Sequence, residues 1–124
     1  MMLGGLRVLI VEDEVLLAED LRETITEAEG VVIGPMATVK DARARLNDSG
    51  SIDAAILDVN LSDGAITPVL ETLRARGVAT LVYTGGSVPE DVRRRHPDLV
   101  ALSKPVQPAR LIAEIRRATG KLVA

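Results

Sequence analysis

Five short apolar segments alternate along the chain with five amphipathic ones, and this alternation limits the fold more than any other feature. The apolar segments are rich in Val, Ile, Leu and Ala, and they predict strands over residues 6–11, 31–33, 54–57, 78–83 and 99–102. Strands that are apolar throughout, each followed by a helix, are typical of a parallel sheet covered on both faces. We therefore predict a doubly wound α/β fold of five strands and five helices, with the flavodoxin-like strand order 2-1-3-4-5.

Start signals mark several of the predicted helices. Thr38 followed by Asp41, and Ser87 followed by Glu90, each resemble a capping box, in which side chains satisfy free amides at a helix start. Thr67-Pro68 indicates an N-cap and a first helical residue. For the first helix, apolar spacing predicts that five residues face the sheet: Val15, Leu16, Leu21, Ile25 and Ala28.

The composition excludes several classes of function. The chain has no Cys, so disulfides, thiolate metal sites and Cys nucleophiles are ruled out, and the single His96 cannot form a histidine cluster. A net charge of −3 counts against a general affinity for nucleic acid or anionic lipid, which normally needs a basic patch. No apolar run approaches the ~18 residues of a membrane span, and no signal peptide is recognisable. We therefore expect a cytoplasmic protein.

Polar residues follow four of the predicted strands at the points where those strands end. Glu12 and Asp13 follow the first strand, Asp58 the third, Thr84 the fourth and Lys104 the fifth. The carboxyl ends of parallel strands share one edge of the sheet, and ligands bind there, at the point where the strand order reverses. We therefore expect these five residues to lie together, with three carboxylates contributed by two neighbouring strands.

The expected group of side chains suits one kind of chemistry. Three close carboxylates repel one another, so a cation is needed if all three are charged at neutral pH. Mg²⁺ prefers oxygen ligands and usually binds one or two carboxylates while keeping several waters. Lys104 adds a fixed positive charge and Thr84 adds a hydroxyl. A carboxylate nucleophile beside a metal, a cation and a hydrogen-bond donor can accept a phosphoryl group.

These residues, together with the Lys104-Pro105 dipeptide, resemble the signature of the receiver domains of two-component response regulators, and the resemblance covers essentially the whole chain. The resemblance implies that Asp58 is the phosphoacceptor and that Asp13 and Asp58 bind Mg²⁺ directly. It also implies that Glu12 binds the metal mainly through water and that Asn60 offers its backbone carbonyl.

The same resemblance implies a function and partners. Thr84 and Lys104 would contact the phosphoryl group, and a cis bond before Pro105 would orient the lysine. We expect one receiver domain over residues 1–124 with no output domain, which catalyses only its own phosphorylation and dephosphorylation. The phosphoryl donor would be a sensor histidine kinase or a histidine phosphotransfer protein. The phosphorylated domain would act on a downstream protein partner, pass the phosphoryl group on or drain it from a kinase, as a monomer or weak dimer.

Two positions depart from the family pattern. Many receivers carry Tyr or Phe three residues before the lysine, a side chain that moves inward on phosphorylation, and this chain has Ala101 there. Many also have Pro four residues after the acceptor, where this chain has Ser62. We expect the signal to leave instead through the segment 84–86. Residues 58–61 and 83–86 look closest to the FAT-GUY subgroup of single-domain receivers.

Two other classes of function fit parts of the pattern. A small Mg²⁺-dependent phosphatase of the haloacid-dehalogenase type also uses an Asp nucleophile, but it normally has a second Asp two residues later, where Asn60 stands here. A flavodoxin-like binding module would need a nucleotide or flavin fingerprint. None is visible, and the chain has no Phe or Trp to stack on a flavin.

Overall fold

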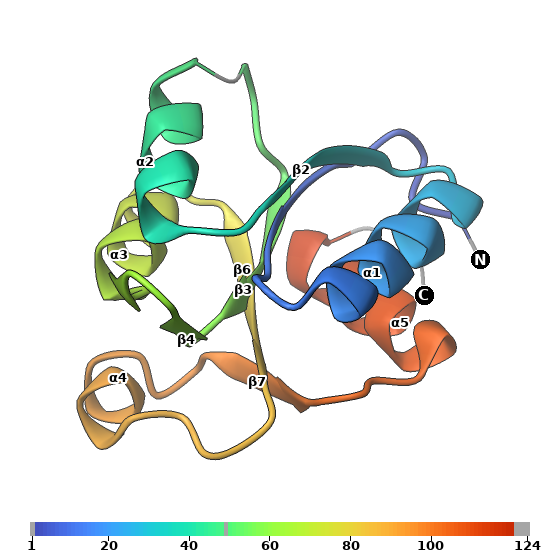
Figure 1. Ribbon diagram of the computed structural model, residues 1–124. Helices are drawn as coiled ribbons and strands as arrows, with labels where there is room; N and C mark the ends of the chain where they lie inside the picture. The colour runs from blue at the N-terminus through green and yellow to red at the C-terminus, as the bar shows by residue number, and fades with distance from the viewer. Residues whose placement is uncertain (1, 49, 121–124) are drawn as a thin grey trace.

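A five-stranded parallel sheet runs through the centre of the molecule, with its strands in the order β2-β1-β3-β6-β7 (Figure 1). The computed structural model describes residues 2–48 and 50–120. Counted in chain order, the strand order is 2-1-3-4-5, so the predicted fold is confirmed. The five strands are β1 (Arg7–Val11), β2 (Val31–Met36), β3 (Ala54–Asp58), β6 (Ala79–Thr84) and β7 (Val100–Ser103).

The helices cover both faces of this sheet. Two of them, α1 (Val15–Glu27) and α5 (Pro108–Thr119), lie on one face. The other face is covered by α2 (Val39–Asp48), α3 (Thr67–Ala75) and α4 (Glu90–Arg95), as Figure 1 shows. None of the helices within residues 2–48 and 50–120 has the length and apolar character needed to span a membrane.

The core is aliphatic and lies on both sides of the sheet. Every residue of β3 is buried, because this strand is in the middle of the sheet with helices above and below. Successive side chains of a strand point to opposite faces, which explains why strands covered on both faces are apolar throughout. One set of strand side chains packs against α2, α3 and α4, and it consists of Leu9, Val11, Ala55, Leu57 and Val82. The other set packs against α1 and α5, and it consists of Val8, Ile10, Ala54, Ile56 and Leu81.

The start of α1 differs from the sequence prediction. Val15 and Leu16, predicted to face the sheet, are 73% and 77% exposed. The helix packs instead through Ala18, Leu21 and Ile25, which are buried. At about 100° per residue, Leu16 lies on the opposite side of the helix from this buried face, and Val15 lies on its flank. Apolar character alone was therefore a poor guide to this first turn.

The capping predictions have mixed outcomes. Thr38 is confirmed as a cap, because its Oγ1 accepts a hydrogen bond from the Asp41 amide at 3.0 Å. The capping box at Ser87 is wrong: α4 begins later, at Glu90, and no side chain caps it. Thr67 is the first residue of α3 and not its N-cap, so that prediction is displaced by one position.

Two features of the strands were not predicted. Strand β2 does not close at residue 33 but continues to Met36, and the register with β1 shifts between Leu9 and Val11. In addition, β4 (Asn60–Leu61) and β5 (Gly64–Ala65) pair as a small antiparallel hairpin directly after β3. This hairpin occupies the loop that follows Asp58.

Gly34 is the backbone position that we expect to be least tolerant of a side chain. Its φ is +102°, and an added Cβ would lie 2.8 Å from the Met36 amide nitrogen and 2.9 Å from the Ile10 carbonyl oxygen. Replacing Gly34 by Ala should therefore lower the free energy of unfolding by about 3 kcal/mol. Urea denaturation followed by circular dichroism measures this change.

Gly77→Ala is the matched control for this substitution. Gly77 also has a positive φ, +77°, but an added Cβ meets nothing within 4 Å. Only the backbone conformation opposes the change, so the expected loss is about 1 kcal/mol. Equal losses for the two variants would contradict the crowding that we assign to Gly34.

Candidate functional site

The carboxyl ends of four adjacent strands meet at one edge of the sheet and bring the predicted site residues together. Glu12 follows β1, Asp58 ends β3, Thr84 ends β6 and Lys104 follows β7. Strand β3 lies between β1 and β6, and β7 pairs with β6. The strand order therefore places residues that are up to 92 positions apart (Glu12 and Lys104) at one site.

Three carboxylates form the acidic part of the site. Glu12, Asp13 and Asp58 each offer one oxygen, and these oxygens all lie within 4.8 Å of one another. Glu12 and Asp58 are buried, at 2% and 5% exposure, whereas Asp13 is exposed. The cluster therefore has two carboxylates fixed in the protein interior and a third on the side that solvent can reach.

Lys104 supplies the positive charge of the site. Its Nζ lies 2.7 Å from Glu12 Oε1 and 3.0 Å from Asp58 Oδ2, and its side chain is only 15% exposed. The Lys104 amide also donates a hydrogen bond to the Thr84 carbonyl oxygen at 2.9 Å. The Lys104–Pro105 peptide bond is cis, as predicted. The lysine is thus held at both its backbone and its ammonium group.

The charges of the site alter two pKa values. Burial raises the pKa of Glu12, although hydrogen bonds from Lys104 and the Glu14 amide act in the opposite direction. Burial of Lys104 disfavours its charge, but hydrogen bonds with Glu12 and Asp58 outweigh this and raise the pKa of the lysine. Both groups thus retain protons more strongly than usual, Glu12 because it is buried and Lys104 because its ammonium lies against two carboxylates.

This imbalance, together with the chemistry of the donors, fits a divalent cation. The donors are hard carboxylate oxygens, which suit Mg²⁺, and added positive charge would relieve the repulsion among them. The residues present therefore fit a magnesium ion. Glu12, Asp13 and Asp58 are the residues that could hold it.

Three polar side chains of the site are oriented by backbone amides. In each case the amide that donates the hydrogen bond belongs to the residue two positions after the side chain that accepts it. The Glu14 amide donates to Glu12 Oε2 at 3.0 Å and the Gly86 amide to Thr84 Oγ1 at 3.1 Å. The Asn60 amide donates to Asp58 Oδ1 at 3.2 Å. The role of these amides was not predicted from the sequence. The signal was present, because polar side chains at the start of turns commonly bind the amide two residues on.

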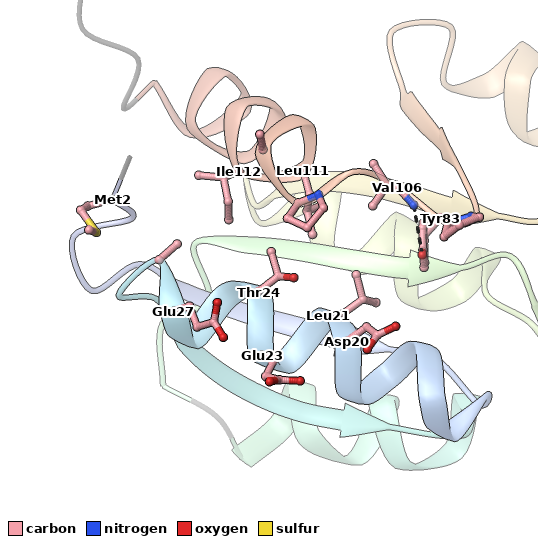
Figure 2. Close-up of a pocket in the computed structure, with 14 residues that line it drawn as sticks. Met2, Asp20, Leu21, Glu23, Thr24, Glu27, Tyr83, Val106, Leu111 and Ile112 are labelled. Atoms are coloured by element: carbon pink, nitrogen blue, oxygen red, sulfur yellow. Dashed lines mark hydrogen bonds between the residues drawn. The ribbon is translucent and has the colours of Figure 1, made fainter.

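A large groove lies apart from the acidic cluster. It is a groove of about 600 Å³ between α1 and α5, with Leu21, Leu111 and Ile112 among its lining residues (Figure 2). At the end drawn on the right of Figure 2, the Tyr83 hydroxyl accepts a hydrogen bond from the Val106 amide at 3.4 Å. Tyr83 therefore packs on the α1 and α5 side of the sheet, in the core cluster of that face.

Comparison with known proteins identifies the family. Residues 8–116 match the family model for the response regulator receiver domain. The chain belongs to this family. It is thus a receiver domain of two-component response regulators, as the resemblance implied. A search of curated proteins found no match.

Solved structures agree with this assignment. SdrG from Sphingomonas melonis Fr1 is 39% identical to this receiver domain, with a TM-score of 0.76, and the match covers 92% of this chain and 98% of SdrG. The BeF3-activated conformation of SdrG, from Pseudomonas melonis Fr1, is 41% identical with a TM-score of 0.72 and the same coverage. A receiver protein from Sinorhizobium medicae WSM419 is 22% identical, covers 95% and 97%, and has a TM-score of 0.83, which shows the shared fold.

Removing the positive charge of Lys104 should destabilise the folded protein. Replacing Lys104 by Met leaves Glu12 and Asp58 buried without their positive partner, so the free energy of unfolding should fall by about 2–3 kcal/mol. Chemical denaturation at neutral pH with EDTA measures the change. Lys40→Met is the control, since Lys40 is exposed on α2 and its loss should change stability by less than about 0.5 kcal/mol. Equal stability of the Lys104 variant and the wild type would contradict this account.

Proposed function

We propose that this receiver domain accepts a phosphoryl group on Asp58 in a Mg²⁺-dependent reaction. The observation that carries the proposal is the position of the Asp58 carboxylate, which ends the central strand between an acid pair and Lys104. Its two oxygens are held separately, Oδ1 by the Asn60 amide and Oδ2 by the Lys104 ammonium. A buried carboxylate oriented in this way is a suitable nucleophile.

The donor that we propose is a phosphohistidine of a sensor histidine kinase or of a histidine phosphotransfer protein. An Asp58 oxygen attacks the phosphorus atom, and the bond from phosphorus to the imidazole nitrogen breaks. The electron pair of that bond stays with the imidazole, and the product on Asp58 is an acyl phosphate. Lys104 then lies beside the new charge on the phosphoryl oxygens, where an ammonium is stabilising.

The metal ligands that we propose are Asp13 and Asp58 directly, Glu12 mainly through water, and the backbone carbonyl of Asn60. Mg²⁺, when bound, supplies positive charge that offsets the charge of the phosphoryl oxygens. Support comes from the oxygen-rich donor set and from the exposure of Asp13, because Mg²⁺ usually keeps several waters and so needs an open side.

For the output we propose a hydroxyl and loop movement at Thr84 and the two glycines that follow. The Thr84 hydroxyl accepts a hydrogen bond from the Gly86 amide, so its own proton is free to donate to a phosphoryl oxygen. The family's usual aromatic switch has no counterpart here, since its position is the small, exposed Ala101, and Tyr83 belongs to the opposite core cluster. The segment leads into α4, which would present the change to a protein partner.

Relatives support this proposal without testing it. SdrG, which is 41% identical, has a BeF3-activated conformation. Beryllofluoride resembles a phosphoryl group in shape and charge, and we propose that Asp58 responds to it in the same manner. The assignment to the FAT-GUY subgroup remains a prediction from residues 58–61 and 83–86.

Substitution of the acceptor tests the proposal directly. With Mg²⁺ and acetyl phosphate, the wild-type protein should gain the mass of one phosphoryl group and lose it slowly, whereas Asp58→Asn should gain none. Intact mass spectrometry over time records both. Asp91→Asn, which changes an exposed carboxylate on α4, should behave as wild type. Phosphorylation of another residue at comparable yield would overturn the assignment, and steady release of phosphate without an adduct would indicate a phosphatase.

A second variant tests the metal site. Asp13→Asn should weaken Mg²⁺ binding by at least about tenfold, since it replaces a charged ligand with a neutral one. Titration calorimetry with MgCl₂ measures the affinity. The control is Glu14→Gln, because Glu14 is a neighbouring exposed acid that contributes its amide, not its carboxylate, to the site. Unchanged affinity in the Asp13 variant would remove this residue from the site.

A further inference from the structure

One aspartate side chain joins the loop after the phosphoacceptor to the start of a distant helix. Asp63 lies in the turn of the β4–β5 hairpin. Its Oδ1 accepts a hydrogen bond from the Val39 amide at 2.9 Å and its Oδ2 accepts one from the Lys40 amide at 3.1 Å. Val39 and Lys40 are the first two residues of α2. Both oxygens of one exposed carboxylate therefore bind another element of the fold.

The amides bound by Asp63 are groups that need an outside partner. The first amides of a helix have no acceptor within the helix, and the positive end of the helix dipole favours an anion beside them. Thr38, the residue before α2, satisfies the Asp41 amide, and Asp63 satisfies the two preceding ones. These hydrogen bonds lower the pKa of Asp63, so the side chain is charged at neutral pH.

The other end of the hairpin lies at the candidate site. Asn60 pairs with Ala65 across the hairpin, and the Asn60 amide donates to the Asp58 carboxylate. Leu61, in the pair next to the turn, and Ile66, which follows β5, are buried in the core. The turn itself is exposed, and a two-stranded hairpin of this size is not stable on its own. Its position therefore depends on contacts at both ends.

We propose that Asp63 is a positioning residue: by clamping the hairpin to α2, it fixes the Asn60 backbone beside Asp58 and at the proposed metal site. The part that concerns Mg²⁺ rests on the proposed function, whereas the link to the Asn60 amide does not. The hairpin has only two pairs of residues between its turn and its base, Asn60 with Ala65 and Leu61 with Gly64. Only the Leu61–Gly64 pair therefore separates the turn from Asn60, and a displacement of the turn should also move the Asn60 backbone.

The test compares Asp63→Ala with Asp63→Asn. The alanine variant loses both acceptors, so in metal-free protein the Val39, Lys40 and Asn60 amides should all exchange with solvent about tenfold faster. Its Mg²⁺ affinity should fall about tenfold, the lower end of the effect of residues that orient metal ligands. The asparagine variant keeps one carbonyl oxygen at the same place, and it should recover most of the affinity and the protection of the Asn60 amide.

Asp41→Asn is the matched control for charge. Asp41 is an exposed acid in the same first turn of α2, so its substitution also removes one negative charge but leaves the clamp in place. Its Mg²⁺ affinity should stay within about twofold of wild type, since exposed charges at this range are screened by salt. Nuclear magnetic resonance hydrogen exchange and titration calorimetry supply the two measurements.

Three results would overturn the proposal. The first is faster exchange at Val39 and Lys40 with unchanged exchange at Asn60, which would make Asp63 a helix cap and nothing more. The second is unchanged Mg²⁺ affinity in an alanine variant whose Asn60 amide has lost protection. The third is an asparagine variant as weak as the alanine variant, which would assign the effect to charge. If the wild-type protein itself binds no Mg²⁺, the proposed function fails, and exchange at Asn60 still decides whether the clamp exists.

Discussion

The close approach of three carboxylates at one edge of the sheet is the constraint around which the rest of the site is arranged. Such a cluster is unfavourable by itself, and two of its members, Glu12 and Asp58, are buried, where charge is costly. Lys104 offsets part of this cost through contacts of 2.7 and 3.0 Å. One ammonium cannot balance three carboxylates, and a further cation would relieve the repulsion that remains.

The remainder of the fold serves to hold that cluster in place. The aliphatic core on both faces of β3 fixes the strand that ends in Asp58. The turns that follow the strands then orient each polar side chain through the amide two residues on, as at Glu12, Asp58 and Thr84. Rigid strands thus set the positions of the side chains, and short local hydrogen bonds set their directions. The β4–β5 hairpin extends this arrangement from Asp58 to the start of α2.

This domain differs from many of its family in how a change at the site could spread. The position of the usual mobile aromatic holds Ala101, on an edge strand and exposed. The single aromatic residue, Tyr83, packs between the sheet and the helices α1 and α5. The route that we propose for a conformational change is therefore polar, through the segment that follows Thr84.

The sequence by itself determined the alternation of strands and helices, the two-sided core and the set of polar residues at the strand ends, because apolar periodicity and strand-end positions are local properties of the chain. The strand order was predicted from the order that this fold type adopts, and the tertiary structure confirmed it. Prediction from the sequence failed at one helix boundary and where the outcome depended on distant partners. Val15 and Leu16 have apolar side chains, yet no neighbouring element covers them. Ser87 has the spacing of a cap, yet α4 begins without it. The clamp from Asp63 to Val39 joins residues 24 positions apart, and only the packing of α2 beside the hairpin decides that contact.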